Sequence, residues 1–339
     1  MRILVTGASG FIGRHVAQCL ATAGYEVVAQ GRDADRLAPM AAVAETVKAD
    51  LAEDPLAPLL RDCEAVVHCA ALSSPWGREQ DFQRANVLAT QRLALAAQAA
   101  GVARMVHLGS PSIYFRFSDR YDVPEAFTPP RRWITPYARS KWESEEVLRS
   151  LRGRVPETVI LRPRAVFGEG DQAILPRLLA VAERGRFPLV GGGGAWIDIT
   201  YIDNVVHAIT LALKVPTVTH GRAYNIANGE PMRVRTLMQK VFGSLDMPVR
   251  FFSLPRPVAI GMAGAAETWA RCRPGCPEPR LSRYGVGVIG YSQTLDISAA
   301  RNELGYQPQV DIATGIERFS RFWRRSRKTG RMEPQDASA

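Results

Sequence analysis

A tyrosine and a lysine four residues apart, Tyr137 and Lys141, could together move a proton. Side chains at positions i and i+4 project from the same face of a helix. A cation close to a phenol lowers its pKa, so the tyrosine could exchange a proton with a carbonyl or an alcohol at neutral pH. The same pair also occurs on the surface of ordinary amphipathic helices. Ser110 favours the chemical interpretation, because it follows the strand-like residues 106–109, and open α/β sheets bind ligands at the carboxyl ends of their strands.

A glycine-rich turn at the start of the chain predicts a nucleotide site. The apolar residues 3–5 lead into Thr-Gly-Ala-Ser-Gly-Phe-Ile-Gly at residues 6–13. Where a strand turns into a helix, Gly7 would permit the tight turn, Gly10 the close approach of a pyrophosphate, and Gly13 the packing of helix on strand. The pyrophosphate would lie at the helix N-terminus, where free N–H groups and the helix dipole favour negative charge.

Strands alternating with helices would bring these groups together. Short runs rich in Val, Ile and Leu suit strands that are covered on both faces. They predict strands over residues 26–29, 46–49, 65–70, 104–109 and 158–161. The Ala-rich segment 86–100 predicts a helix that stops at Gly101. The sequence therefore predicts an α/β fold with a doubly wound parallel Rossmann sheet.

The regular alternation ends after Gly168, where Pro- and Gly-rich loops begin. We expect residues 1–168 to form the dinucleotide-binding Rossmann domain, with returns to the sheet near 198–228, at residues 198–201 and 223–226. Residues 169–325 would form mainly a smaller, interleaved C-terminal substrate-binding lobe. Residues 326–339 would be a basic, disordered tail.

The composition indicates a folded protein and excludes several classes. Of the 339 residues, 46% are hydrophobic and 22% charged, which permits a substantial core. The longest apolar stretch, residues 258–266, is far shorter than the roughly 20 residues that span a bilayer. Five cysteines suit a reducing cytosol, and Cys272 and Cys276 lack the second pair or nearby histidine of a zinc site, so we expect no metal. A strand that begins at residue 2 leaves no room for a signal peptide, and we expect a cytoplasmic protein.

The formal net charge of +10 is concentrated near the C-terminus, where seven basic and two acidic residues occur from Arg318 onward. Phe319, Phe322 and Trp323 lie among them. The segment could be a terminal helix that docks its aromatic side chains, or a peripheral contact for a membrane or an enzyme complex. No nucleic-acid-binding motif accompanies the charge, so we expect no nucleic acid partner.

Together these motifs resemble those of the extended short-chain dehydrogenase/reductases, over essentially the full folded length. Leu161-Arg162-Pro163 and Tyr-Ile-Asp-Asn-Val at 201–205 belong to the same pattern. Within that superfamily the chain is most similar to the 3β-hydroxysteroid dehydrogenase branch. Residues 73–77 and 168–171 also resemble segments of bacterial 2-alkyl-3-oxoalkanoate reductases.

The resemblance implies a nicotinamide dinucleotide cofactor. Many NAD-preferring relatives carry an aspartate at the end of the second strand, where this chain has Gly31 followed by Arg32. A guanidinium could bind a 2′-phosphate, so we predict NADP(H) in preference to NAD(H). Alternatively, Arg32 is a surface residue that pairs with Asp33 or Asp35. The implied cofactor contacts are Gly7, Ser9, Gly10, Phe11, Ile12, Gly13 and Arg32, then Asp50, Leu51, Cys69, Ala70 and Ala71, and finally Tyr137, Lys141, Pro163, Ala165 and Val166.

The resemblance also implies the catalytic roles. Tyr137 would give its proton to a carbonyl oxygen, Lys141 would hold the ribose and stabilise the phenolate, and Ser110 would fix the oxygen. Ser112 is a competing hydroxyl, but in the family pattern the catalytic serine lies four residues before a tyrosine, here Tyr114. Asn86 would support the site from the neighbouring helix, or would simply cap that helix.

The substrate is expected to be apolar. Nucleotide-sugar members of the superfamily carry Asn and Arg as diphosphate anchors where this chain has Ala165 and Ile197. A 3-hydroxysteroid or a 2-alkyl-3-oxoacid suits these replacements better. The expected substrate residues are Ser73, Trp76, Ser112, Arg164 and Trp196. Trp76, Phe187, Trp196 and Ile197 would form an apolar wall, or else ordinary lobe core, and Arg164 would bind a carboxylate or else face solvent.

Two other functions remain open from the sequence. One is a nucleotide-sugar epimerase or dehydratase, and the other is a non-catalytic NADP-sensing binder, which would not need Ser110, Tyr137 and Lys141 together. Whichever function applies, we expect the protein to form a homodimer.

Overall fold

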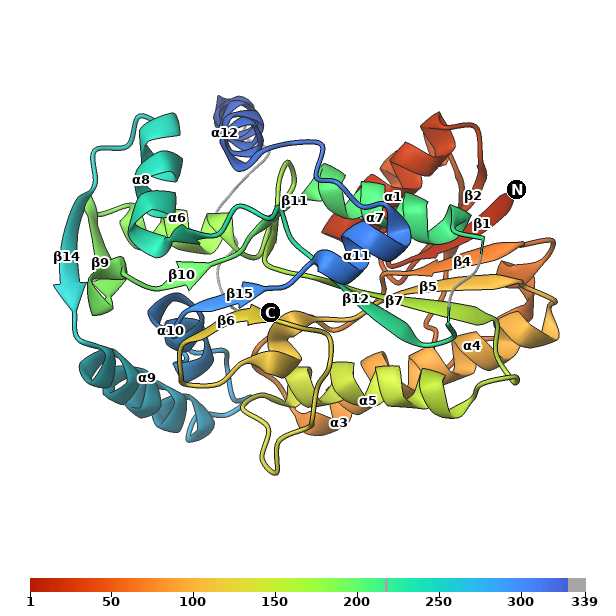
Figure 1. Ribbon diagram of the computed structural model, residues 1–339, viewed down its shortest axis with the longest axis horizontal. Coiled ribbons are helices and arrows are strands. Elements are labelled where there is room, and N and C mark those ends of the chain that lie inside the picture. The colour runs from red at the N-terminus through yellow and green to blue at the C-terminus, as the bar shows by residue number, and fades with distance from the viewer. Residues whose placement is uncertain (217–218, 329–339) are drawn as a thin grey trace.

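Seven parallel strands form the central sheet of the computed structural model, which describes residues 1–216 and 219–328 (Figure 1). Their order is β12-β7-β5-β4-β1-β2-β3. The strands are β1 (Arg2–Thr6), β2 (Glu26–Gly31), β3 (Glu45–Lys48), β4 (Ala65–His68), β5 (Arg104–Leu108), β7 (Glu157–Pro163) and β12 (Arg222–Ile226). The predicted doubly wound parallel fold is confirmed, and each strand predicted from an apolar run is present within two residues of its expected ends.

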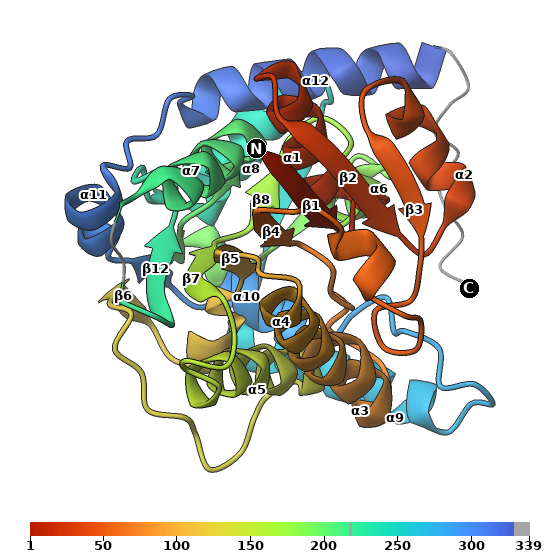
Figure 2. The same cartoon turned by 90° about the vertical axis from the view of Figure 1, so that its right-hand side faces the viewer.

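Helices cover both faces of this sheet, as Figures 1 and 2 show. One face carries α1 (Phe11–Thr22), α7 (Ile202–Lys214) and α11 (Ser298–Leu304); the other carries α4 (Ala89–Ala99) and α5 (Pro136–Ser150). Short helices α2 (Ala34–Leu37) and α3 (Glu79–Phe82) complete this half. The helix predicted over 86–100 is longer and less regular than expected, because a π turn over Gln83–Leu88 lies between α3 and α4.

The smaller lobe has its own core and its own short sheets. Its helices are α6 (Leu175–Ala182), α8 (Val234–Ser244), α9 (Arg256–Arg271) and α10 (Arg283–Gly290). Strands β9 (Arg186–Val190) and β14 (Arg250–Leu254) pair with each other. A four-stranded sheet has the order β13 (Met232–Arg233), β10 (Trp196–Ile197), β15 (Gln293–Leu295) and β6 (Arg120–Val123). Phe187 and Ile197 belong to the lobe core, as one of the two expectations for these side chains had it.

One predicted return to the central sheet is wrong. Residues 223–226 do return, as part of β12, but residues 198–201 do not. There, β11 (Thr200–Tyr201) pairs only with β8 (Val166–Phe167), outside the seven-stranded sheet. The physical reason is the length of the extended segment. It contains only two residues and is followed directly by α7, which packs on one face of the sheet.

The C-terminal helix α12 (Ile312–Lys328) docks through its aromatic side chains. Phe319 is fully buried in the lobe core and stacks on Trp323, while Arg318 and Arg324 pair with Asp203 and Asp246. The docking interpretation of the basic segment is therefore supported as far as residue 328. The helix extends three residues into the predicted tail, of which residues 329–339 lie outside the described part of the chain. Among the helices that are described, none is both long and apolar enough to cross a membrane.

Candidate active site

The start of α5 positions Tyr137 and Lys141 on one helix face. Thr135 caps the helix by accepting a hydrogen bond from the Ala138 N–H at 3.1 Å, and Pro136 takes the first helical position, where no N–H is required. Lys141 is buried and Tyr137 half-buried. Ser110 follows β5 after one residue, Gly109, at the sheet edge to which all the parallel strands point their carboxyl ends.

Burial decides the protonation of these groups. It lowers the pKa of Lys141 to about 8, although the Glu145 carboxylate opposes this change. It raises the pKa of Tyr137, and hydrogen bonding to Ser110 acts in the other direction. The expected lowering of the tyrosine pKa by the lysine is therefore not what the structure has, because loss of solvent outweighs the neighbouring groups. Tyr137 is a protonated donor at neutral pH.

Ser110, and not Ser112, interacts with the phenol of Tyr137. The Ser110 hydroxyl donates to the Ser112 hydroxyl at 3.0 Å and accepts from the Ser112 N–H at 3.3 Å. Ser112 is more deeply buried, and both its hydroxyl and its N–H bond to the Ser110 hydroxyl. The family spacing predicts Ser110 as the catalytic hydroxyl, and the interaction of Ser110 with the Tyr137 phenol is consistent with that prediction.

Asn86 ties the loop after β4 to the catalytic helix. Its side-chain oxygen accepts from the Leu72 N–H at 2.7 Å, and its amide donates to the Leu72 carbonyl at 3.1 Å and to Ser140 at 2.9 Å. None of these partners is an N–H group at the start of the helix that contains Asn86, so Asn86 does not simply cap that helix. It lies in the π turn before α4, an irregularity common near functional sites. Asn86 is a positioning residue for α5.

Two buried histidines behind the site escaped the sequence analysis. His68 Nδ1 is 2.7 Å from the Thr6 hydroxyl and Nε2 is 2.9 Å from the Thr90 hydroxyl. Thr90 donates to the Asn86 carbonyl, so it must accept from Nε2–H, and this fixes the neutral tautomer of His68. Burial, reinforced by the charge of Lys141, lowers the pKa of His68 to about 3. His107 on β5 is likewise held neutral, with its pKa well below the usual value.

A buried ion pair fixes α5 to the sheet and also escaped the sequence analysis. Arg162 on β7 binds the Glu145 carboxylate through two of its nitrogens, at 3.0 and 2.5 Å. Arg149 adds a third bond to Glu145 at 2.9 Å. The signal was present in the sequence, because Glu145 follows Lys141 by four residues and so shares its face of the helix.

The glycine turn fits a dinucleotide. Gly7 adopts a φ of +68°, which L side chains rarely take, and a side chain at Gly13 would collide with the Gly7 backbone. Gly10 caps α1 without any side-chain hydrogen bond, and the first turn contains no acidic residue. The N–H groups of that turn are therefore available to a pyrophosphate.

The adenosine end of the site has no room for an acid. A Cβ at Gly31 would lie 2.6 Å from the Ser9 hydroxyl. Arg32 is exposed and has no hydrogen bond or ion pair with any residue that the structure describes, whereas Arg36 pairs with Asp33 and donates to Gln172. The surface pairing that we considered for Arg32 thus belongs to Arg36.

The other predicted cofactor residues lie in several settings. Asp50 is bound by Arg84 at 3.0 Å, and Leu51 belongs to the core under the sheet. Cys69, Ala70 and Ala71 follow β4, and Pro163 ends β7. Phe11 and Ile12 begin α1, and Val166 begins β8. Except for Leu51, which is core, these positions surround the carboxyl ends of the strands.

The predicted substrate residues lie in different local settings. Trp76 donates to the Cys276 carbonyl at 2.8 Å, so the loop holding Ser73 and Trp76 meets the loop between α9 and α10. Arg164 is 5% exposed, which contradicts the expectation that it faces solvent. Trp196, on β10, is 38% exposed, and the Arg233 guanidinium lies over its ring.

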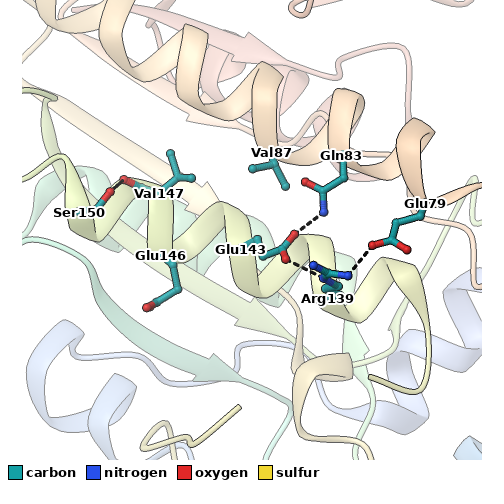
Figure 3. Close-up of a pocket in the computed structure, with 8 residues that line it drawn as sticks. All are labelled: Glu79, Gln83, Val87, Arg139, Glu143, Glu146, Val147 and Ser150. Atoms are coloured by element: carbon teal, nitrogen blue, oxygen red, sulfur yellow. Dashed lines mark hydrogen bonds and ion pairs between the residues drawn. The ribbon is translucent and has the colours of Figure 1, made fainter. Parts of the chain in front are cut away.

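A surface groove is a separate feature, bounded on one side by α5 and on the other by α3 and the π turn that follows it (Figure 3). Arg139 bridges Glu79 and Glu143 within it, and Val87 and Val147 form its apolar part. The α5 residues that line it do not include Tyr137 or Lys141. The groove is therefore not part of the candidate active site.

Comparison with known proteins identifies the class to which this fold and site belong. Residues 3–227 match the NAD dependent epimerase/dehydratase family, and the chain belongs to that family of enzymes. It is 39% identical over 96% of its length to the uncharacterized protein YbjS of Escherichia coli, of which it covers 98%. It is 32% identical over 94% of its length to a 2-alkyl-3-oxoalkanoate reductase of Stenotrophomonas maltophilia, of which it covers 98%.

More distant relatives agree with this placement. The chain is 27% identical over 96% of its length to the decarboxylating sterol-4-alpha-carboxylate 3-dehydrogenase of Homo sapiens, covering 89% of it. Among solved structures, dTDP-glucose 4,6-dehydratase from Streptomyces venezuelae, with NAD and TYD bound, superposes with a TM-score of 0.77 at 28% identity, covering 99% of this chain and 100% of that one. The resemblance to extended short-chain dehydrogenase/reductases of the 3β-hydroxysteroid dehydrogenase type is confirmed.

Proposed function

We propose that this enzyme reduces a ketone on an apolar substrate to a secondary alcohol with NADPH, and catalyses the reverse reaction with NADP⁺. The observation that carries the proposal is the grouping of Ser110, Tyr137 and Lys141 at the sheet edge that also bears the glycine turn. A redox-sensing binder would have no need of a buried lysine on the same helix face as a half-buried tyrosine.

The residues divide the work by their protonation. A bound nicotinamide would supply the hydride. Tyr137, protonated at neutral pH, gives its proton to the carbonyl oxygen as that oxygen gains charge. Ser110 donates to the same oxygen and orients it. The buried ammonium of Lys141 stabilises the phenolate that Tyr137 leaves behind, and the Asn86 and Glu145 contacts keep α5 in place while the proton moves.

Two observations favour an apolar ketone over a nucleotide sugar. Ala165 has no hydrogen-bonding side chain, and Ile197 is packed into the lobe core. Relatives at similar coverage are named as reductases of oxoalkanoates and dehydrogenases of sterols. The likeness in fold to a sugar dehydratase keeps a nucleotide-sugar reaction as the second candidate.

Replacement of Tyr137 by phenylalanine tests the proposal. Tyr137→Phe should lower kcat for a 2-alkyl-3-oxoalkanoate or a 3-ketosteroid by about 10²–10⁴-fold, because only proton transfer is removed. NADPH binding, measured by nucleotide fluorescence, should be unchanged. Tyr121→Phe, at an exposed tyrosine on β6, is the matched control and should retain full activity. Near-normal kcat in Tyr137→Phe, or turnover of nucleotide sugars alone, would refute the proposal.

A further inference from the structure

Arg164 carries a buried positive charge that no described residue neutralises by direct contact. It is 5% exposed, and its guanidinium makes neither a hydrogen bond nor an ion pair with any residue the structure describes. Unsatisfied buried donors are costly, and more so when they are charged. Such a group in a native protein requires an explanation.

The contrast with Arg162 shows that the fold does not force this arrangement. Arg162 lies two residues earlier in the chain and is also buried, but it has a carboxylate partner in Glu145. The backbone at Arg164 is fixed independently of its side chain, because its N–H donates to Ile226 at 2.9 Å and its carbonyl accepts from Thr200 at 2.6 Å. The guanidinium is therefore not needed to hold this segment.

Tyr284, on α10, lies near both Arg164 and Tyr137. Burial raises the pKa of Tyr284 to about 12, and the charges of Arg164 and Tyr137 act on that pKa in opposite directions. Its hydroxyl bonds to no residue within the described chain. Its ring packs edge-on against Phe115, which closes the turn after Ser110. Gly287, one helical turn further, brings α10 this close, because any side chain there would collide with Phe115.

The nearest acid does not satisfy Arg164. Asp198 is buried and interacts with the arginine through space, but its carboxylate accepts the Leu295 N–H at 2.7 Å and is not within ion-pair distance. The backbone after Arg164 is also strained, since Ala165 adopts a φ of +43°. Strain of this kind tends to be retained where function requires it.

We propose that Arg164 and Tyr284 form a subsite for a carboxylate of the substrate, beside the carbonyl that Tyr137 protonates. This inference rests on the proposed reduction and narrows its substrate class to keto acids, in which an anionic group lies a few bonds from the ketone. Arg164 supplies charge and paired N–H donors, and the Tyr284 hydroxyl donates a further hydrogen bond. A neutral ketosteroid leaves the guanidinium unsatisfied.

A diphosphate could also satisfy Arg164, so the test uses both anions and a neutral analogue. The probes are a 2-alkyl-3-oxoalkanoate, its methyl ester, which keeps the ketone without the charge, and UDP-glucose. The variants are Arg164→Met, Arg164→Lys and Tyr284→Phe. Arg61→Met removes one exposed positive charge elsewhere and is the control for net charge. Binding of the 3-hydroxyalkanoate product to the NADP⁺ complex, measured by calorimetry, gives a readout apart from turnover.

The unmodified enzyme should prefer the acid to its ester by about 100-fold in kcat/KM, a ratio in the range of lost charged hydrogen bonds. Arg164→Met should remove this preference, mainly through KM, and leave the ester within about threefold. Arg164→Lys should restore part of the preference for the acid. Tyr284→Phe should lower kcat/KM for the acid about 10-fold. Arg61→Met should leave kcat/KM unchanged for both substrates. Calorimetry should show the same order for the hydroxy acid.

Three outcomes overturn the subsite. Equal losses for acid and ester in Arg164→Met would show that the arginine is structural. An unmodified enzyme that does not distinguish the two would show that no anion is bound there. Binding of UDP-glucose that depends on Arg164, without binding of either acid, would assign the site to a diphosphate. If no ketone is reduced while the hydroxy acid still binds through Arg164, the proposed reaction fails and the subsite stands.

Discussion

We predict that the choice between NADPH and NADH depends on Arg32. It is free of ion pairs with the described residues, and Ser9 occupies the space that a side chain at Gly31 would need. Arg32→Glu should therefore weaken NADPH binding by at least 10-fold, since a bidentate contact to phosphate is replaced by repulsion. Fluorescence titration with both nucleotides measures this change.

The matched control is Arg36→Glu, at an arginine already engaged by Asp33 and Gln172, which should weaken NADPH binding much less. Gly31→Asp alone should not create NADH preference, because Ser9 blocks the new side chain. Equal or tighter binding of NADH than NADPH by the unmodified enzyme would contradict our interpretation of this pocket.

His68 makes the fold sensitive to acid. The folded protein holds it neutral down to about pH 3, whereas the usual pKa in an unfolded chain is 6.5. Unfolding therefore takes up a proton between these values, and the free energy of unfolding falls as pH drops below 6.5. Between pH 7 and pH 5, the titration of His68 alone should lower the free energy of unfolding by about 2 kcal/mol.

His68→Gln keeps a donor and an acceptor but does not titrate. Denaturant unfolding at pH 7 and pH 5 should show a less stable variant whose loss of stability on acidification is smaller than that of the unmodified enzyme by about 2 kcal/mol. Asp198, whose pKa is raised by burial to about 6, has the opposite dependence, but it is common to both proteins and cancels. Parallel pH curves would show that His68 already titrates in the folded state.

Individual residues were predictable from sequence where their spacing carried the chemistry. Ser110 belongs to a local pattern at the end of a strand, and Tyr137 and Lys141 belong to a local pattern on one helix face. Tyr284 was not predictable, because its partners lie 120 and 147 residues earlier in the chain and only tertiary packing brings them together. That Arg164 has no ion-pair partner among the described residues is likewise a property of the folded site alone.

At the scale of elements, helix α5 connects the candidate catalytic side chains to the central sheet. One face carries Tyr137, Lys141 and Glu145, and the last of these binds Arg162 on β7. Glu145→Gln should lower the free energy of unfolding by about 3–5 kcal/mol, because it leaves the Arg162 charge buried without its partner. It should also lower the pKa of Lys141 further, since the glutamate charge currently raises it.

Glu146→Gln is the control, because Glu146 is half-exposed and also pairs with Arg149, and it should cost less than about 1 kcal/mol. Chemical denaturation measures the stabilities, and NADPH affinity reports on Lys141. Equal effects of the two changes would show that the pair with Arg162 contributes no more than a surface ion pair.

The predictability of an element followed its length. The central strands are long enough for a continuous apolar run, so their positions were clear. Strands β8, β10 and β11 contain two residues each, too few for any periodicity, and the expected return at residues 198–201 failed for that reason. The π turn before α4 was hidden because its residues, Gln83–Leu88, have the composition of an ordinary helix.

At the scale of the whole molecule, the two halves share a boundary instead of being joined by a linker. Ile12 and Val166 pack against both the sheet core and the lobe core, and β12 returns to the sheet after the lobe has begun. The chain that follows β12 contributes again to both halves, through α11 and α12. We therefore expect the enzyme to unfold as one cooperative unit.

Phe319→Ala tests this cooperativity from the last helix. The side chain is fully buried in the lobe core, so its removal should cost about 3–5 kcal/mol. If the halves unfold together, calorimetry should show a single transition at lower temperature. NADPH, which we expect to bind the Rossmann half, should then raise the Tm of the variant as much as that of the unmodified enzyme. Phe252→Ala, at a partly exposed phenylalanine of the same lobe, should shift the Tm much less. Two resolved transitions in Phe319→Ala, only one of them shifted by NADPH, would show that the lobe unfolds independently.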